Sequence, residues 1–222
     1  MINLPNFEDA FEHENDFYLS CEGSRIAKLL AHFKFFEITA KIEGEIIECG
    51  VFKGASFSRF AMYRKILNLE HKKLIGFDTF GSFPETNYEK DKEMRKKFIE
   101  EAGEESISKS QLEDVLKNKD CFQNTDLIKG DIVKTVPEFM IQNPKLKISL
   151  LNLDVDIYEP TVTILKNFYE KISEGGLLIL DDFNSFPGET SAVKEYFSGK
   201  NVKIKNPIFP NTPYFIQKKT ST

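Results

Sequence analysis

The sequence predicts an α/β protein whose helices pack on a mostly parallel sheet, and three observations support this fold class. Short apolar runs alternate along the chain with amphipathic helical stretches, which is typical of such a sheet. The run ISLLNLDV starts as a nearly continuous apolar segment, as expected of a strand buried on both faces. In GEIIECGVFKGASF, a strand leads through a glycine-bracketed turn into a helix. Ligands of such sheets bind outside the carboxyl ends of the strands.

The first half of the chain is expected to contain a helix, a strand–turn–helix unit and a second strand. Residues 24–39 carry apolar side chains at steps of three and four, with Ser24 as the expected helix cap. An extended segment at 45–49 enters the turn at 50–54, and a helix follows that turn. The run KLIGFDTFG then forms a strand that ends in Asp78.

The second half repeats the alternation and ends in an antiparallel pair. The runs DLIKGDIV, ISLLNLDV and LLILDDF supply the third, fourth and fifth strands. A helix is expected at 161–172, which the glycines at 175–176 end, and another near 192–197. NVKIKNPIFP and PYFIQKK face each other across Pro-Asn-Thr-Pro, which predicts a terminal hairpin.

Residues 85–120 differ from the rest because they are highly charged and poor in large apolar side chains. The segment holds 11 acidic and 8 basic residues. This composition indicates solvated helices that lie over the body as a lid; the alternative is a plain surface insertion. We expect residues 1–222 to form a single domain with the charged helical lid at 85–120 inserted into it.

Composition and charge argue against several classes of protein. The 30 basic and 35 acidic residues give a formal net charge of -5, which argues against binding to nucleic acid. Cys21, Cys49 and Cys121 form no CxxC pattern, so neither a disulfide framework nor a zinc knuckle is expected. The acidic N-terminus does not resemble a signal peptide, and no apolar run reaches the roughly 20 residues of a membrane helix. These features predict a cytoplasmic protein without a membrane partner.

Acidic residues stand in or directly after every predicted parallel strand. Because parallel strands end at the same edge of a sheet, we expect these side chains to gather there. Any one of them alone has a structural explanation, since Asp also caps helices and starts turns. The residues are Glu48, Asp78, Asp131, Asp154, Asp156, Asp181 and Asp182.

The acids of the first two strands suit a cofactor that carries a ribose and a cationic group. Asp78 stands where the second-strand acid of a dinucleotide-like fold binds ribose hydroxyls. The turn from Gly50 to Gly54 lets backbone approach a ligand closely, but it lacks a full GxGxxG. Glu48 would repel a pyrophosphate and attract an amino-acid ammonium. The pattern favours S-adenosylmethionine over NAD or ATP; the alternative is that Glu48 is merely structural.

The acids of the last two parallel strands suit a metal ion. Asp154, Asp181 and Asp182, with Asp156 beside them, cannot all remain ionised close together without a cation. Carboxylate oxygens favour a hard ion such as Mg²⁺, and the scattered histidines argue against zinc. The alternative is that one or two of these residues satisfy backbone groups.

Taken in order, GEIIECGVFKGASF, LIGFDTFGSFPE, LIKGDI, LLNLDVDIYEPT and GGLLILDDF resemble the macrocin O-methyltransferase (TylF-type) family of class I S-adenosylmethionine-dependent methyltransferases. The similarity spans roughly residues 22–216. It implies a Rossmann-like sandwich with a mostly parallel seven-stranded sheet, a C-terminal antiparallel hairpin and a helical lid. It also implies a Mg²⁺-dependent O-methyltransferase that acts on a deoxysugar hydroxyl, with a nucleotide-linked sugar favoured, and a possible homodimer.

The resemblance also assigns roles to the residues at the strand ends. Asp156 would be the general base, and Tyr158 would help enclose the sugar. Mg²⁺ would be held by Asp154, Asp181 and Asp182. S-adenosylmethionine would be bound by Glu48, Gly50, Gly54, Ser56, Asp78, Ser82, Gly130 and Asp131.

Three other functions remain open at this point. A catechol-like phenolic O-methyltransferase would use the same fold and metal. A nicotinamide-dependent oxidoreductase is disfavoured by Glu48 and by the incomplete glycine pattern. A non-catalytic binding module would leave the acid cluster without an obvious use.

Overall fold

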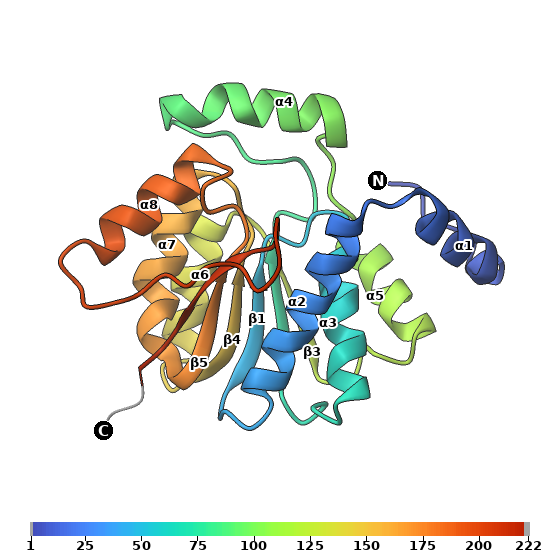
Figure 1. The fold of residues 1–222 in the computed structure, drawn as a ribbon, viewed down its shortest axis with the longest axis horizontal. Helices are drawn as coiled ribbons and strands as arrows, with labels where there is room; N and C mark the ends of the chain where they lie inside the picture. Colours follow the sequence, from blue (N-terminus) through green and yellow to red (C-terminus); the bar gives the residue numbers. More distant parts are fainter. Residues whose placement is uncertain (1, 220–222) are drawn as a thin grey trace.

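The strands form one six-stranded sheet with helices on both faces (Figure 1). The computed structural model describes residues 2–219. In the strand order β3-β2-β1-β4-β5-β6, strands β1 to β5 are parallel and β6 is antiparallel to β5. The predicted α/β class is therefore confirmed. The strands are β1 Glu45–Cys49, β2 Leu74–Asp78, β3 Thr125–Lys129, β4 Ile148–Leu153, β5 Ile172–Leu180 and β6 Tyr214–Gln217.

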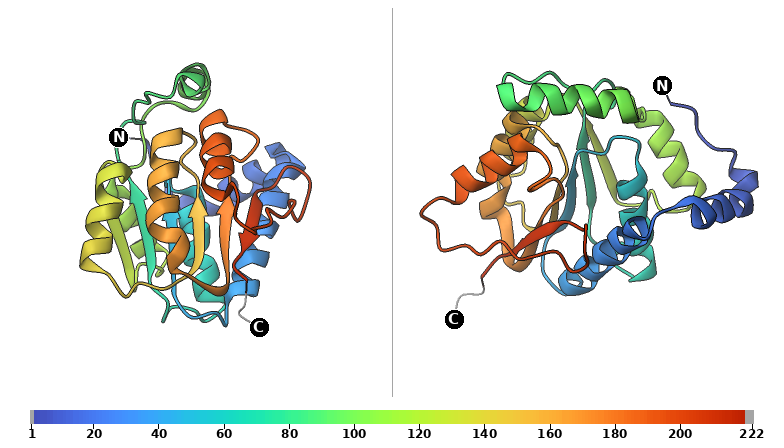
Figure 2. Two further views of the ribbon diagram at one scale, coloured as in Figure 1. Left: turned by 90° about the vertical axis from the view of Figure 1, so that its left-hand side faces the viewer. Right: turned by 45° about the horizontal axis from the view of Figure 1, so that its top comes forward.

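Two hydrophobic cores lie on opposite faces of the sheet, because successive strand residues point to opposite sides. Ile46 belongs to the core shared with α2, α3 and α5, and Ile47 belongs to the core shared with α6, α7 and α8 (Figure 2). The helices are α1 Ala10–Ser20, α2 Gly23–Thr39, α3 Ala55–Ile66, α4 Lys92–Ala102, α5 Lys109–Asn118, α6 Ile132–Gln142, α7 Tyr158–Phe168 and α8 Pro187–Phe197, with short 3₁₀ helices η1 Phe7–Asp9, η2 Glu89–Asp91 and η3 Tyr169–Lys171.

The sheet of the described residues has six strands, so the predicted count of seven is wrong. The antiparallel C-terminal pairing is present, but the partner of β6 is β5. The segment NVKIKNPIFP contributes only an isolated bridge between Lys205 and Phe215, with N···O distances of 2.8 and 3.3 Å. Pro207 follows two residues later and has no N–H with which to continue the ladder.

The glycines at 175–176 lie inside β5 and do not end the preceding helix. Helix α7 stops at Phe168, and η3 leads directly into the strand. The pairing of β5 with β4 shifts register between Ile148 and Leu150, next to these glycines. A Cβ on Gly176 would lie 2.9 Å from the Ser149 carbonyl oxygen, so this irregular pairing requires a residue without a side chain.

The charged segment 85–120 divides into two parts with different surroundings. Helix α4 has no buried residue and lies across the carboxyl ends of the strands (Figure 1). Helix α5 buries Leu112, Val115 and Leu116 in the core next to α3. Of the expected lid, only the part up to α4 covers the strand ends; α5 belongs to the body.

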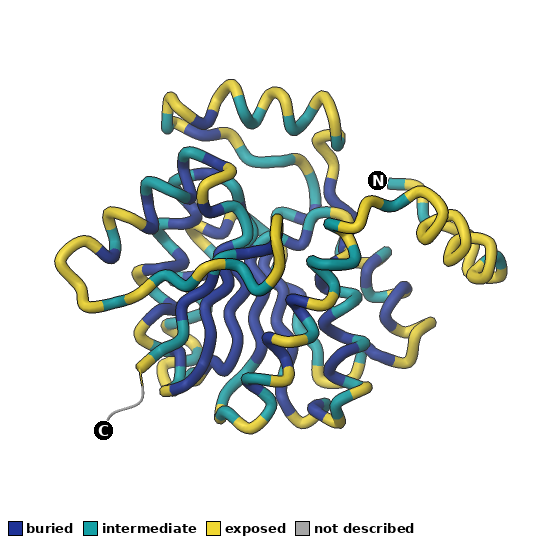
Figure 3. The backbone as a smooth tube through the Cα atoms, in the orientation of Figure 1, coloured by how far each residue is buried: buried dark blue, intermediate teal, exposed yellow. Residues whose placement is uncertain are grey.

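The N-terminal helix α1 extends away from the body and buries none of its residues (Figure 3). The expected cap of α2, Ser24, lies inside the helix, whose N-cap is Glu22. No helix within residues 2–219 combines the length and the apolar character needed to cross a membrane.

Candidate active site

The strand order reverses between β1 and β4, and a cavity opens at that point of the sheet edge. The cavity has a volume of about 1270 Å³. Its walls come from α1, α2, the glycine turn, the ends of β2, β4 and β5, and the lid segment. They include Lys28, Gly50, Asp78, Asp154, Asp182 and Phe98. The predicted site at the carboxyl ends of the strands thus coincides with the cavity.

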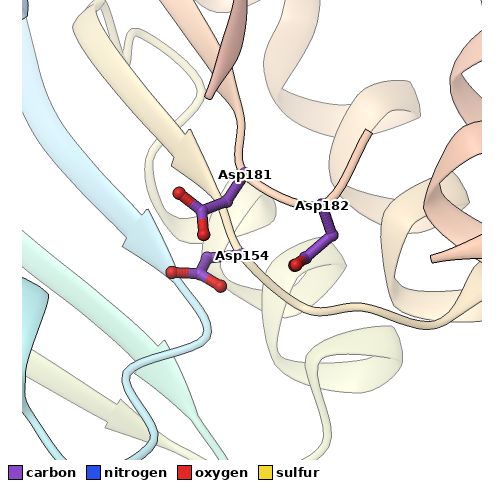
Figure 4. A group of neighbouring side chains, drawn as sticks. All are labelled: Asp154, Asp181 and Asp182. Atoms are coloured by element: carbon purple, nitrogen blue, oxygen red, sulfur yellow. The ribbon is translucent and has the colours of Figure 1, made fainter. Parts of the chain in front are cut away.

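Three of the predicted acids converge at one corner of this cavity (Figure 4). One oxygen from each of Asp154, Asp181 and Asp182 lies within 4.8 Å of the other two. The pairing of β4 with β5 causes this, because it places Leu153 beside Leu180 and each strand continues directly into an acid. The Asp181 amide donates to the Leu153 carbonyl at 3.0 Å, which extends the ladder to the acids.

Burial and mutual repulsion disfavour the ionised form of several acids. Burial and the charge of Asp181 raise the pKa of Asp154 well above its usual value. Burial and the charge of Asp156 likewise raise the pKa of Asp182 well above its usual value. Burial, followed by the charge of Asp154, raises the pKa of Asp156 to about 7. These three acids therefore bind protons more tightly than ordinary aspartates do, and a nearby cation would counteract this.

Lys28 on α2 supplies one compensating charge. Its Nζ lies 2.5 Å from Asp181 Oδ2. Burial alone would lower the Lys28 pKa, but the carboxylates of Asp181 and Asp154 outweigh burial and raise it. Burial would likewise raise the Asp181 pKa, but Lys28 and His32 hold that pKa below its usual range.

His32 lies one turn after Lys28, and its Nε2 is 3.8 Å from Asp181 Oδ1. Burial lowers the pKa of His32, which disfavours the charged imidazolium beside the acids. Sequence reasoning did not select Lys28 or His32. Their spacing of four residues inside a predicted helix was a usable signal, because it places both side chains on one helical face.

A further carboxyl group, Glu189 on α8, lies behind the cluster and was also missed. Its side chain is fully buried, and Oε1 accepts the Asp182 amide at 3.2 Å. Burial, and after it the charge of Asp182, raises the Glu189 pKa well above its usual value. No sequence signal pointed to Glu189, because it lies within a helix and not at a strand end.

Asp156, the expected base, is held in a constrained loop that faces the cavity. Its φ of 61° is in the left-handed region, which a residue other than glycine seldom adopts. Its carbonyl accepts the Glu189 amide at 3.1 Å, and the residue lines the cavity. Such strain is typical of functional loops.

Glu48 is completely buried on β1, and its pKa is raised to about 7, chiefly by burial. Oε1 accepts the Asn152 amide at 3.0 Å. Oε2 is buried and has no hydrogen-bond partner in the described part of the chain. The neighbouring residue Ser56 lines the cavity. Glu48 itself is not part of the cavity wall.

Asp78 performs a structural task that the sequence did not reveal. Oδ2 accepts the backbone amides of Val51 and Phe52 at 2.8 and 3.0 Å, and so fixes the glycine turn. Oδ1 accepts the Phe80 amide at 2.6 Å and the Ser106 hydroxyl at 2.9 Å, with a longer bond of 3.4 Å from Thr79. Its carboxylate is therefore fully engaged with protein groups.

The glycines of the turn are explained by packing within the protein. Gly50 has φ +91°, and a Cβ there would lie 1.6 Å from the Asp154 carbonyl oxygen. Gly54 has φ +81° and precedes α3 as its N-cap. The sequence predicted that some group approaches the backbone closely at this turn. At Gly50, that group is the loop after β4, which carries the acids.

Several predicted residues are not part of the cavity wall. Ser82 is exposed and donates to Glu105 at 2.8 Å. Tyr158 points to the lid, where its ring stacks on Tyr88 with centroids 4.6 Å apart and its hydroxyl donates to Glu195. Gly130 does not line the cavity, whereas Asp131 does and also caps α6 by accepting the Val133 amide.

The acid cluster meets the chemical requirements of a hard dication. Asp181 Oδ1 and Asp182 Oδ2 are buried and have no hydrogen-bond partner among the residues that the structure describes. Buried oxygens of this kind are normally satisfied, and both could bind a cation. An all-oxygen set at this spacing suits Mg²⁺.

Comparison with known proteins identifies relatives of the chain. The family model described as Macrocin-O-methyltransferase (TylF) matches residues 23–211. The chain is 26% identical over 162 residues to the demethyldecarbamoylnovobiocin O-methyltransferase of Streptomyces niveus, an alignment that covers 70% of this chain and 58% of that protein. It is 27% identical over 149 residues to the 8-demethyl-8-(2,3-dimethoxy-alpha-L-rhamnosyl)-tetracenomycin-C 4'-O-methyltransferase of Streptomyces olivaceus. That alignment covers 64% of this chain and 54% of that protein. The chain thus spans less than two thirds of either relative.

Among solved structures, the calicheamicin methyltransferase CalS11 superposes with a TM-score of 0.77 at 23% identity. The match covers 97% of this chain and 87% of that one. This likeness supports the Rossmann-like methyltransferase fold across nearly all of the chain.

Proposed function

Because the chain belongs to the macrocin O-methyltransferase (TylF) family, we propose that it transfers a methyl group from S-adenosylmethionine to a hydroxyl of a deoxysugar with the help of Mg²⁺. The observation that supports this most strongly is the convergence of Asp154, Asp181 and Asp182 on one corner of the cavity, where two buried oxygens lack partners. The relatives that match the chain are named O-methyltransferases, and one name includes a rhamnosyl group.

The residues divide into a metal-binding and a proton-accepting set. Asp154, Asp181 and Asp182 would hold Mg²⁺, which when bound lowers the pKa of a coordinated hydroxyl. Asp156 would take up the hydroxyl proton as the sugar oxygen bonds to the methyl carbon and the bond from that carbon to sulfur breaks, with S-adenosylhomocysteine as the leaving group. In the metal-free protein, burial and the charge of Asp154 raise the pKa of Asp156 to about 7, and bound Mg²⁺ would lower that pKa again by offsetting the charge of Asp154. Phe98 and the lid exclude water from this step.

The cofactor would lie along the glycine turn. Glu48 Oε2 would accept the ammonium group of its amino-acid part, near the Ser56 hydroxyl. Asp78 would reach the ribose only if hydroxyls replaced some of its present partners, of which the Ser106 hydroxyl is the simplest to exchange. Asp131 stands at the far end of the same wall.

Two arginines support a nucleotide-linked sugar as the acceptor. Arg25 and Arg59 line the cavity; Arg59 Nε is buried without a hydrogen-bond partner in residues 2–219, and the charge of Arg59 acts on Glu48. One guanidinium group can donate two parallel hydrogen bonds to two oxygens of a phosphate. A diphosphate would therefore satisfy these arginines better than an uncharged natural product.

A panel experiment tests this function. The chain is incubated with S-adenosylmethionine and nucleotide deoxysugars, with Mg²⁺ or with a chelator, and products are read by mass spectrometry. We expect a gain of one methyl group that depends on Mg²⁺. Methylation of a diphenol, with none of the sugars, would instead select the catechol-like enzyme, which the aromatic pair of Phe52 and Phe98, at 5.3 Å, would suit.

One substitution should distinguish the role of the metal from the binding of the cofactor. Asp154→Asn should abolish turnover while S-adenosylhomocysteine still binds, because the residue faces the metal corner. Asp114→Asn, at an exposed position of α5, is the matched control and should retain full turnover. Full activity of Asp154→Asn in excess chelator would show that the metal assignment is wrong.

A further inference from the structure

A buried carboxylate, that of Asp91, joins the root of the lid to the body. Asp91 ends η2, directly before α4, and is fully buried. Its Oδ2 accepts the Tyr158 amide at 2.9 Å, and its Oδ1 accepts the Gly188 amide at 2.7 Å. A single side chain of the lid therefore bridges two segments of the body.

Both partners of Asp91 stand at the starts of helices that follow the acidic loops. Tyr158 begins α7, directly after the loop that carries Asp154 and Asp156. Gly188 is the second residue of α8, directly after the loop that begins with Asp181 and Asp182. The first amides of a helix have no partner within it and attract negative charge. The Asp91 carboxylate satisfies one such amide on each helix and so fixes the two loops relative to each other.

The close fit at Gly188 shows that this bridge is built into the structure. A Cβ at Gly188 would lie 2.0 Å from Asp91 Oδ2 and 2.5 Å from the Tyr158 amide nitrogen. Any side chain there would push the carboxylate away from the two helices. Glycine is therefore required by the approach of Asp91.

A second set of contacts holds the same root. Glu159 on α7 accepts the Thr86 hydroxyl at 2.9 Å and the amides of Asn87 and Tyr88 at 2.8 and 3.1 Å. The Tyr88 hydroxyl donates to Ser191 on α8 at 2.9 Å. The lid root thus contacts α7 and α8 through both Asp91 and the segment before it.

We propose that Asp91 is a positioning residue that couples the lid to the metal-binding acids. When the lid root packs on the starts of α7 and α8, the loops that carry Asp154 and Asp182 take up their arrangement in the same step. This inference rests on the proposed function, because it assigns Asp91 to the geometry of the same metal site. Asp91 acts through the two helix starts and touches neither the acids' carboxylates nor the cavity.

The substitution Asp91→Asn tests the coupling. An amide can accept at one position only, so one helix-start amide is left without a partner. We expect the Kd of Mg²⁺, measured by calorimetry, to rise roughly 10-fold, within the usual range for residues that support metal ligands. Hydrogen exchange should accelerate together at the starts of α7 and α8 and in the lid, and kcat should fall more than KM rises. Glu93→Gln on the exposed face of α4, where Glu93 pairs with Lys97, is the matched control and should change none of these.

The outcomes distinguish this inference from the proposed function. A folded Asp91→Asn variant with wild-type Mg²⁺ affinity and wild-type exchange would overturn the coupling. If Asp91→Asn does not fold, Gly188→Ala disturbs the same bridge from α8, because its Cβ would meet Asp91 Oδ2, and unchanged exchange and Mg²⁺ affinity in that variant would overturn the coupling equally. Wild-type protein that neither binds Mg²⁺ nor transfers a methyl group would instead refute the proposed function.

Discussion

Single residues decide how the negative charge of the acid cluster is offset in the absence of a metal ion. Lys28 lies 2.5 Å from Asp181 and within the field of Asp154 and Asp182. Its ammonium group offsets one negative charge where a divalent ion would offset two. A metal ion and an ammonium group this close would repel each other, so Lys28 would compete with the proposed Mg²⁺ for the same oxygens.

Lys28→Met is expected to tighten Mg²⁺ binding and to destabilise the metal-free protein. The methionine keeps the apolar stem but removes the competing charge, which leaves the acids less compensated. Calorimetry should give a Kd for Mg²⁺ about 10-fold lower than that of the wild type, equivalent to about 1.4 kcal/mol. Lys34→Met on the same helix, where Lys34 pairs only with exposed Glu37, is the control. Weaker binding in Lys28→Met would mean that Lys28 supports the metal ligands.

Elements of secondary structure show where sequence patterns succeeded. Strands and their acidic ends were predictable because buried strands are apolar and parallel strands finish at one edge. The direction of a loop side chain has no such periodicity, so Ser82 and Tyr158 were assigned to a cavity that they do not line. The high content of charged residues in 85–120 likewise led us to overlook the apolar side chains of Leu112, Val115 and Leu116, although their spacing is helical.

The two helices of the charged segment should therefore respond differently to truncation. Leu112→Ala in α5 removes a fully buried side chain and should lower the free energy of unfolding by about 3 kcal/mol. Phe98→Ala in α4 removes a ring that lines the cavity and should reduce methyl transfer, with less loss of stability. Urea unfolding and turnover measured on both variants test this. Equal loss of stability would show that α4 is also part of the body.

For the whole molecule, the raised pKa values of the buried acids link stability to pH. Glu48 and Asp156 have pKa values of about 7, far above those of an unfolded chain, so folding takes up protons. Stability is then present at lower pH and is lost as pH rises through about 7. The lowered pKa values of His32 and Asp181 act in the opposite direction, but only below about pH 6.5.

In chelator, Tm should therefore fall between about pH 6.5 and about pH 8, because each proton taken up on folding contributes about 1.4 kcal/mol per pH unit. Saturating Mg²⁺ should reduce this fall, since metal binding favours ionised carboxylates. Differential scanning fluorimetry at the two pH values, with and without Mg²⁺, measures both effects. A Tm that rises with pH in chelator would contradict this linkage.

The most direct test of the proposed metal site is a crystal of the protein grown with Mn²⁺ and S-adenosylhomocysteine, with anomalous data collected for manganese. We expect a single strong anomalous peak bonded to oxygens of Asp154, Asp181 and Asp182, with Lys28 displaced from Asp181 and the cofactor product along the glycine turn. A map with no peak there, and with Lys28 still paired to Asp181 beside bound S-adenosylhomocysteine, would contradict it.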